Sequence, residues 1–230
     1  MKRFWKEATV ECDGEGWGIR LDGKPLKTPA RAALVVPTEG LADAIAGEWH
    51  DVEASIDPRA MPLTGLANAA IDTVSPGKAT FAAALARYAE SDLLCYRAEG
   101  PQALVDQQSQ AWDSLLAWAR RRYDVDFTTT EGLMHVPQPA ATVERLSHAV
   151  AVLDPFRLAG LSPLVTIGGS LVAALAVAEK AVTATTAWDA VSVDERWQVD
   201  QWGADAEAVA AITARKRDFF AAARFVELLE

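Results

Sequence analysis

A stretch without a single charged side chain, residues 158–178, constrains the fold more than any other feature of the sequence. About 20 apolar residues in a row can cross a bilayer, but a helix that is apolar on all sides can equally be enclosed by other helices. Ser162-Pro163 and Gly168-Gly169-Ser170 divide this stretch into pieces that are each too short to span a membrane. The sequence therefore favours a buried central helix in a soluble protein, and a membrane-associated factor is the alternative.

The first forty residues carry the pattern of a small antiparallel sheet. Trp17, Ile19 and Leu21 alternate with glycine and arginine, and Asp22-Gly23 follows at once, which is a strong signal for a hairpin turn. The other strand candidates here are residues 9–11, 25–28 and 33–36.

From Thr38 onward the apolar residues follow a helical period. Thr38 is predicted to cap a helix whose buried face carries Leu41, Ile45 and Trp49. Cap-plus-proline pairs and one capping box predict further helix starts at Asp154-Pro155, at Ser162-Pro163 and at Ser192 with Glu195. Residues 125–127 are the only strand candidate in the later part of the chain.

These patterns predict an α+β fold in two domains. A small N-terminal domain of antiparallel sheet and helix is expected over residues 1–65, and a larger all-helical domain over residues 66–230. At 230 residues, with 50% hydrophobic and 23% charged residues, the chain has enough apolar side chains to build a core.

Composition argues against several classes of protein. The formal net charge is −10, so the concentrated basic face that nucleic acid binding needs is not expected. Cys12 and Cys95 are too few and too far apart for a disulfide framework, which favours a reducing compartment. The N-terminal residues meet acidic and polar side chains before an apolar signal segment could form, so no secretory signal is predicted.

Catalytic and metal-binding patterns are scarce. His50, His135 and His148 have no cysteine or acidic partner at metal-ligand spacing, and no glycine-rich stretch is followed by the lysine of a phosphate loop. No catalytic residue, no metal and no cofactor is therefore expected.

Eight tryptophans are the unusual feature of the composition. Glu195 and Gln198 are three residues apart, and Gln198 and Trp202 four apart, so on a helix all three point along one stripe. Such a stripe is either the polar edge of an aromatic core or an exposed binding surface, since tryptophan is enriched among residues that dominate interface energies.

Several stretches, in order along the chain, resemble the ATP-twelve family of chaperones. They are WGIRLDGKPLKTP at 17–29, MPLT at 61–64, LAN at 66–68, ID at 71–72, Tyr88 with SDLLCYR at 91–97, and Glu195 with Gln198 and Trp202-Gly203. The resemblance implies an assembly chaperone that binds the free alpha subunit of the F-type ATP synthase catalytic head and shields its beta-facing surface. It also implies a small α/β domain before a helical one, and a bacterial cytoplasmic member.

Two groups of residues are singled out on this basis. The expected partner-binding residues are Trp49, Glu195, Gln198, Trp202, Gly203, Asp205 and Glu207. Asp72, Asp92 and Arg97 match family positions and are expected to be structural or interdomain polar groups. Asp92 and Arg97 are expected to form a buried ion pair, and contact with the client is the alternative. The protein is expected to be monomeric when free.

An enzyme is the main competing interpretation. It would act on a small molecule between the two domains and would use Asp72, Asp92 and Arg97 as polar groups. Its weakness is that the sequence offers no nucleophile, metal or general-base pair.

Overall fold

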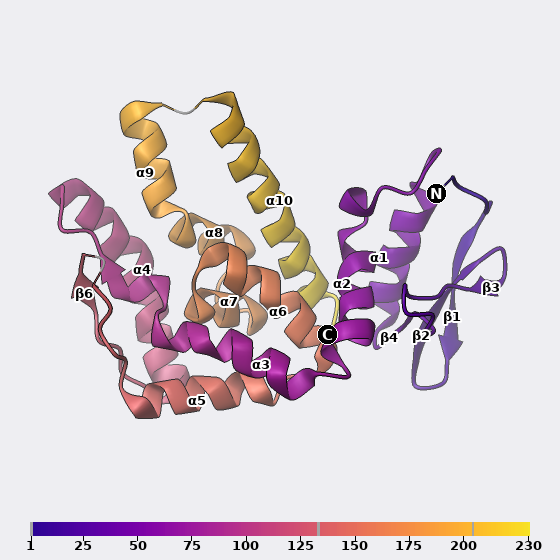
Figure 1. Ribbon diagram of the computed structural model, residues 1–230, viewed down its shortest axis with the longest axis horizontal. Coiled ribbons are helices and arrows are strands. Elements are labelled where there is room, and N and C mark those ends of the chain that lie inside the picture. The colour runs from indigo at the N-terminus through magenta and orange to yellow at the C-terminus, as the bar shows by residue number, and fades with distance from the viewer. Residues whose placement is uncertain (1, 133, 204) are drawn as a thin grey trace. The chain divides into compact units, whose positions relative to one another are not determined.

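The computed structural model describes residues 2–132, 134–203 and 205–230 (Figure 1). The chain divides into two compact units. The first consists of the chain up to Lys78 together with Asp154–Gly160 and Arg224–Glu230, and the second of Ala79–Leu153 and Leu161–Ala223. The boundary predicted between residues 65 and 66 stays a prediction.

An antiparallel sheet forms one layer of the first unit. Its strands are β1 (Ala8–Asp13), β2 (Gly16–Leu21), β3 (Lys24–Pro25) and β4 (Val35–Val36). β2 pairs with each of the other three strands, so it is the centre of the sheet. Asp22 and Gly23 both have a positive φ, 49° and 75°, which is the geometry of a type I′ hairpin turn. The predicted hairpin is confirmed.

A helix covers this sheet, as the apolar period predicted. α1 (Glu39–His50) begins after Thr38, whose Oγ1 accepts a hydrogen bond from Leu41 N, and its buried face packs against β1 and β2 (Figure 1). The unit continues through a short 3-10 turn η1 (Pro58–Ala60), α2 (Pro62–Ala69) and a π-helical turn η2 (Ala70–Val74). Phe225 and Leu229 from the end of the chain complete the same apolar core.

Helices dominate the second unit. Its elements, some of which extend into the first, are α3 (Lys78–Ala86), η3 (Arg87–Glu90), η4 (Leu93–Cys95), β5 (Tyr96–Arg97), α4 (Gln102–Tyr123), β6 (Thr130–Glu131), α5 (Ala140–Ala151), α6 (Pro155–Gly168), α7 (Leu171–Ala178), α8 (Ala184–Val191), α9 (Val193–Trp202) and α10 (Ala206–Glu227). The predicted fold class, a small sheet-and-helix region followed by a helical one, is confirmed.

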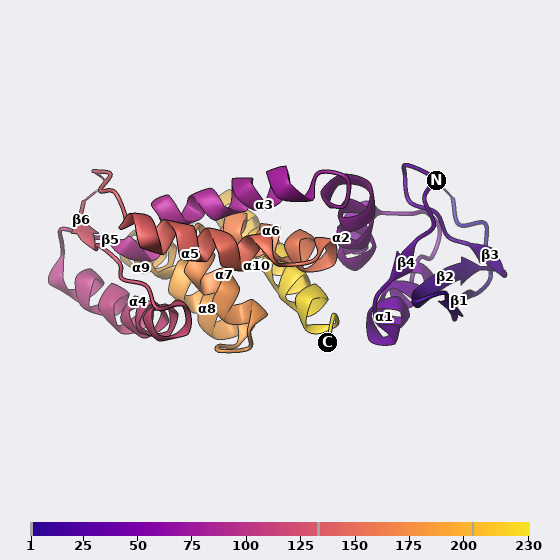
Figure 2. The same cartoon turned by 90° about the horizontal axis from the view of Figure 1, so that it is seen from below.

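From Leu161 onward, the uncharged stretch lies in the second unit, as the later part of α6 and the whole of α7. After Gly169, at φ 67°, Ser170 caps α7 by accepting from Ala173 N at 3.0 Å, and all seven residues from Leu171 to Val177 are buried. α7 contacts α4 and α8, and both views show it beside α8 (Figures 1 and 2). Within the described residues, no helix combines the length and the apolar character needed to cross a membrane. The predicted buried central helix is confirmed.

Two local predictions for the later part of the chain are wrong. Residues 125–127 form no strand, because Thr142 Oγ1 takes both the backbone N–H and the C=O of Asp126 and leaves nothing for a ladder. Instead, β5 and β6 pair in parallel. Pro163 does not open a helix but lies inside α6, which begins at Pro155. Asp154 precedes this helix, and its carboxylate accepts from Phe156 N at 2.9 Å.

Candidate functional site

α9 carries three of the seven residues predicted to bind a partner, Glu195, Gln198 and Trp202, but the helix begins differently from the prediction. Ser192 makes no capping box, because its near-helical backbone at the end of α8 lets its hydroxyl donate back to Trp188 O at 2.7 Å. Glu195 instead forms an ion pair with Arg215 of α10, whose Nη2 also donates to Ile167 O at 2.9 Å. Glu195 therefore ties α9 to α10.

One face of α9 is open to solvent. Gln198 and Gln201 are exposed, Trp197 is half-buried, and Trp202 is 78% exposed. A tryptophan so exposed buries little of its own apolar surface, so it contributes little to the core. The stripe was interpreted either as the edge of an aromatic core or as an exposed surface. Trp202 lies outside the core, so for this residue the structure favours the exposed surface.

This face of α9 borders a groove of about 800 Å³. Gln198 and Trp202 line it, and so does Arg97, so three residues singled out in the sequence come together here. The other wall consists of residues that follow η4 and begin α4. The full lining is Leu93, Tyr96, Arg97, Ala98, Glu99, Gly100, Pro101, Leu104, Gln108, Gly132, Asp194, Trp197, Gln198, Gln201 and Trp202.

Gln108 joins the two walls of the groove. Its side chain is buried, at 2% exposure; Oε1 accepts from Ala98 N at 2.8 Å and Nε2 donates to Asp194 Oδ1 at 2.7 Å. Both ends of the amide are satisfied, so the groove is held open by fixed bonds rather than by mobile side chains. Sequence reasoning missed this residue; the available signal was a glutamine within the apolar face of α4.

Arg97 lines the groove, and its side chain contacts Asp113 and Trp112 instead of the predicted partner Asp92. Its Nη2 donates to Asp113 Oδ1 at 2.7 Å, and its guanidinium lies over the Trp112 ring, 5.1 Å from the centroid. Asp92 is fully buried, and its two oxygens accept from Leu94 N at 3.0 Å and Val172 N at 2.9 Å. The ion pair predicted between Asp92 and Arg97 is wrong, because Asp92 instead caps η4 and the start of α7.

Burial disfavours the charged forms of two groups beside this groove. Burial raises the pKa of Asp92 to about 6, against the hydrogen bonds from Val172, Ser170, Leu94 and Leu171, which lower it. Burial and the nearby Asp92 raise the pKa of the Cys95 thiol to about 12. A thiol in this state is not a nucleophile at neutral pH.

Asp72 and Trp49 belong to the first unit and have structural partners there. Asp72 accepts from Thr28 Oγ1 at 2.7 Å and from Ala30 N at 2.9 Å, which holds that loop against η2. Trp49 is 8% exposed, its ring lies 5.0 Å from that of Trp5, and its carbonyl accepts from Trp5 Nε1. Trp49 is therefore part of the core cluster of its unit.

The remaining predicted residues lie where α9 ends and α10 begins. Gly203 has φ 75° and closes α9, a conformation that favours glycine. Asp205 accepts from Ala208 N at 2.7 Å, and both Asp205 and Glu207 are exposed. Neither acid lines the groove.

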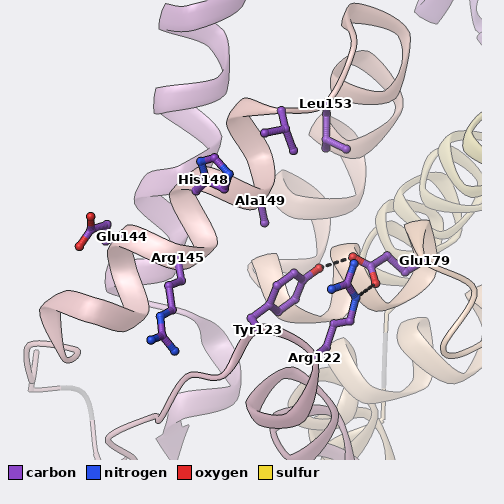
Figure 3. Close-up of a pocket in the computed structure, with 9 residues that line it drawn as sticks. Arg122, Tyr123, Glu144, Arg145, His148, Ala149, Leu153 and Glu179 are labelled. Atoms are coloured by element: carbon purple, nitrogen blue, oxygen red, sulfur yellow. Dashed lines mark hydrogen bonds and ion pairs between the residues drawn. The ribbon is translucent and has the colours of Figure 1, made fainter.

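A second hollow, of about 760 Å³, lies between the end of α4 and α5 (Figure 3). Tyr123 OH donates to Glu179 Oε1 at 2.6 Å, and Arg122 binds the same carboxylate. Burial, and then the bond to Glu179, raise the pKa of Tyr123 well above its ordinary value, so its hydroxyl stays protonated. Among the described residues no group of three or more histidines, cysteines and acids could hold a metal ion.

Comparison with known proteins gives a consistent result. A family model described as "ATP12 chaperone protein" matches residues 2–120. "Protein atp12, mitochondrial" of Schizosaccharomyces pombe is 25% identical over 215 residues, which is 88% of this chain and 74% of that protein. Atp12 from Paracoccus denitrificans is 42% identical with a TM-score of 0.95, over 100% of this chain and 98% of the other. The Atu1473 protein from Agrobacterium tumefaciens is 38% identical with a TM-score of 0.94, over 100% and 86%.

Proposed function

Because the chain belongs to the ATP12 family, whose members are chaperones of ATP synthase assembly, we propose that it binds the free alpha subunit of the F-type catalytic head. It shields the surface that this client subunit later buries against the beta subunit. The protein acts by covering another protein and not by catalysis, and its place of action is the bacterial cytoplasm.

The observation that carries the proposal is the extent of the family likeness. The similarity to Paracoccus denitrificans Atp12 extends over the whole chain at 42% identity, and both units are included in it. An identity of 42% over the full length, with a TM-score of 0.95, supports a shared activity as well as a shared fold.

The exposed side chains of α9 and α10 suit a surface that captures a client and later releases it. Trp202 offers a large apolar contact, and aromatic residues of this kind dominate the energetics of interfaces. Asp205 and Glu207 add exposed negative charge, which steers a client with basic groups toward the surface. A free subunit needs such cover, because large exposed apolar patches rarely persist on soluble monomers.

The predicted binding residues have different parts in this proposal. Gln198, Trp202, Gly203, Asp205 and Glu207 form the contact surface, which we call the α9–α10 surface. Glu195 supports it through its ion pair with Arg215. Trp49, buried in the first unit, packs within its own core.

Co-expression with the alpha subunit of the same organism, followed by size-exclusion chromatography, tests the proposal. A stable complex is expected, and addition of the beta subunit should dissolve it. Purified alpha subunit should also precipitate more slowly when this protein is present. If alpha neither co-elutes nor gains protection, the proposal is wrong.

A further inference from the structure

The groove between the start of α4 and α9 is a preformed surface with an unused apolar lining. On α9, Trp197 and Gln201 are four residues apart, as are Gln198 and Trp202, so all four face the same side of the helix. Half-buried Leu104 lies on the opposite wall. Because Gln108 bonds to both walls, the groove needs no rearrangement before it accepts a ligand.

The size of the groove limits what it can hold. At about 800 Å³ it is within the range of sites that enclose one drug-sized molecule, roughly 300–1,000 Å³. A whole helix face is larger than this. The groove therefore has room for one or two large side chains of a protein segment, and the rest of that segment would lie outside.

The charged side chains at the groove favour a partner with a positive charge. Among the described lining residues the charged side chains are Arg97, Glu99 and Asp194. Arg97 Nη2 pairs with Asp113, while Arg97 Nε and Nη1 are buried without a hydrogen-bond partner among the described residues. The two remaining charged groups are both carboxylates.

Of these two carboxylates, Glu99 is the exposed one. It packs over Gly132, where a Cβ would meet Glu99 Oε1 at 2.6 Å, so the glycine gives this carboxylate its place at the rim. The rim is therefore negative and complements a cation.

From the apolar walls and the acidic rim, we propose that the groove binds one segment of the client that presents a large apolar side chain next to a lysine or arginine. The apolar side chain lies between Trp202 and Leu104, and the cation lies at Glu99. This inference rests on the proposed function, in which the client is the free alpha subunit.

Two groove variants test the apolar part of the inference. Leu104→Glu places a carboxylate inside the groove, in the first turn of α4, where an acid is compatible with the helix. We expect Leu104→Glu and Trp202→Ala each to weaken binding of purified alpha subunit at least about tenfold. The matched control is Phe4→Ala, since Phe4 is also a highly exposed aromatic, at 66%, and lies in the other unit. It should bind like the wild type, and thermal melting should show all three variants folded.

A charge reversal tests the acidic rim. Glu99→Lys should weaken binding about fivefold, because it repels the cation of the segment. Glu144→Lys changes the net charge equally but lies at the second hollow, and it should leave affinity within about twofold. Equal effects of the two variants would mean that only the overall charge matters, which would overturn the rim's assigned role.

A photo-reactive benzoylphenylalanine at Gln201 identifies the occupant directly. Irradiation of the complex should cross-link one alpha-subunit segment in which a large apolar residue neighbours a lysine or arginine. A cross-linked segment without a nearby cation contradicts the inference.

The outcomes separate the inference from the proposed function. If wild-type protein binds alpha and the Leu104→Glu variant binds it equally well, the groove inference fails and the proposed function stands, whatever the effect of Trp202→Ala, because Trp202 belongs to both proposed surfaces. If wild-type protein does not bind alpha at all, both fail. If the free protein is a dimer that Trp202→Ala alone converts to a monomer, a second copy occupies the groove and the inference is overturned.

Discussion

Gln108 Nε2 donates to Asp194 Oδ1 at 2.7 Å, although the two residues are 86 positions apart in the chain. The same buried amide accepts from Ala98 N, so a single side chain fixes α4, α9 and the segment before α4. A buried polar group with all its bonds made is rigid, and one that loses a partner is costly. The shape of the groove therefore depends on a residue at its floor more than on the residues at its rim.

Gln108→Leu should destabilise the protein and distort the groove. It leaves the Ala98 N–H without its acceptor, and the loss of a buried bond of this kind costs about 1–3 kcal/mol. Urea unfolding measures the change. Gln107→Leu, at an exposed neighbouring position, is the control and should shift the free energy of unfolding by less than about 0.5 kcal/mol. Equal stabilities of the two variants would contradict the structural role of Gln108.

Asp92 should make stability depend on pH in an unusual direction. Its pKa is about 6 in the folded protein, against an ordinary value of 3.8, so the folded state binds this proton more tightly than the unfolded state. The stabilisation is fully present below pH 4 and is lost as the pH rises through 6. The shift corresponds to at most about 3 kcal/mol.

Comparison of the wild type with Asp92→Asn isolates this contribution. The free energy of unfolding of the wild type, minus that of the variant, should fall between pH 4 and pH 7. Asp22→Asn is the control of opposite sign, because backbone hydrogen bonds from Glu7 and Lys6 lower the Asp22 pKa. The free energy of unfolding of the wild type, minus that of Asp22→Asn, should decrease as the pH is lowered toward 3. If the difference between wild type and Asp92→Asn does not change with pH, the hydrogen bonds to Asp92 fully offset the effect of burial on its pKa.

Charge reversal should affect Glu195 and Glu207 differently. Glu195→Lys places two cations side by side at Arg215, so the melting temperature should fall by a few degrees; the partly exposed pair itself contributes about 1 kcal/mol or less. Glu207 is exposed at the start of α10, where acids suit the helix terminus, and Glu207→Lys should lower the melting temperature by about one degree or less. Differential scanning fluorimetry distinguishes the two. Equal shifts would mean that the Glu195 pair contributes nothing to the fold.

Thr38 should contribute more to the free energy of unfolding than an ordinary helix cap does. Its Oγ1 accepts from Leu41 N and donates to Leu228 O, so it joins the start of α1 to the end of the chain. Thr38→Val keeps the shape, removes both bonds and should cost about 2 kcal/mol in chemical denaturation. Thr38→Ser keeps the hydroxyl and should lose less than half of that. A larger loss for the serine variant would show that the methyl group matters more than the bonds.

Local signals in the sequence predicted the local structure well. The Asp22-Gly23 turn, the Thr38 cap and the Asp154 cap depend on residues within a few positions, and all three are confirmed. The central apolar helix was predictable because burial on all sides leaves no polar stripe. The Ser192 capping box was wrong because α8 runs up to this serine, which no local pattern indicates.

The groove depends on contacts that are distant in sequence. Trp202 and Gln198 stood out by composition and spacing, but nothing in the sequence brings them to Leu104 or Glu99. The partners of Asp92 and Arg97 were missed for a related reason. Asp92 and Arg97, which both match family positions, were expected to pair with each other, whereas the fold offers Asp92 the backbone N–H groups at the start of α7, 80 residues away.

The contribution of Phe225 and Leu229 to the first core has a consequence for biosynthesis. The sheet and α1 leave the ribosome early, but Phe225 and Leu229, which complete their apolar layer, are made about 175 residues after α1. At about 5–20 residues per second, the delay is on the order of ten seconds. During synthesis, the first apolar core of this protein therefore stays incomplete until residues 225–229 have been made.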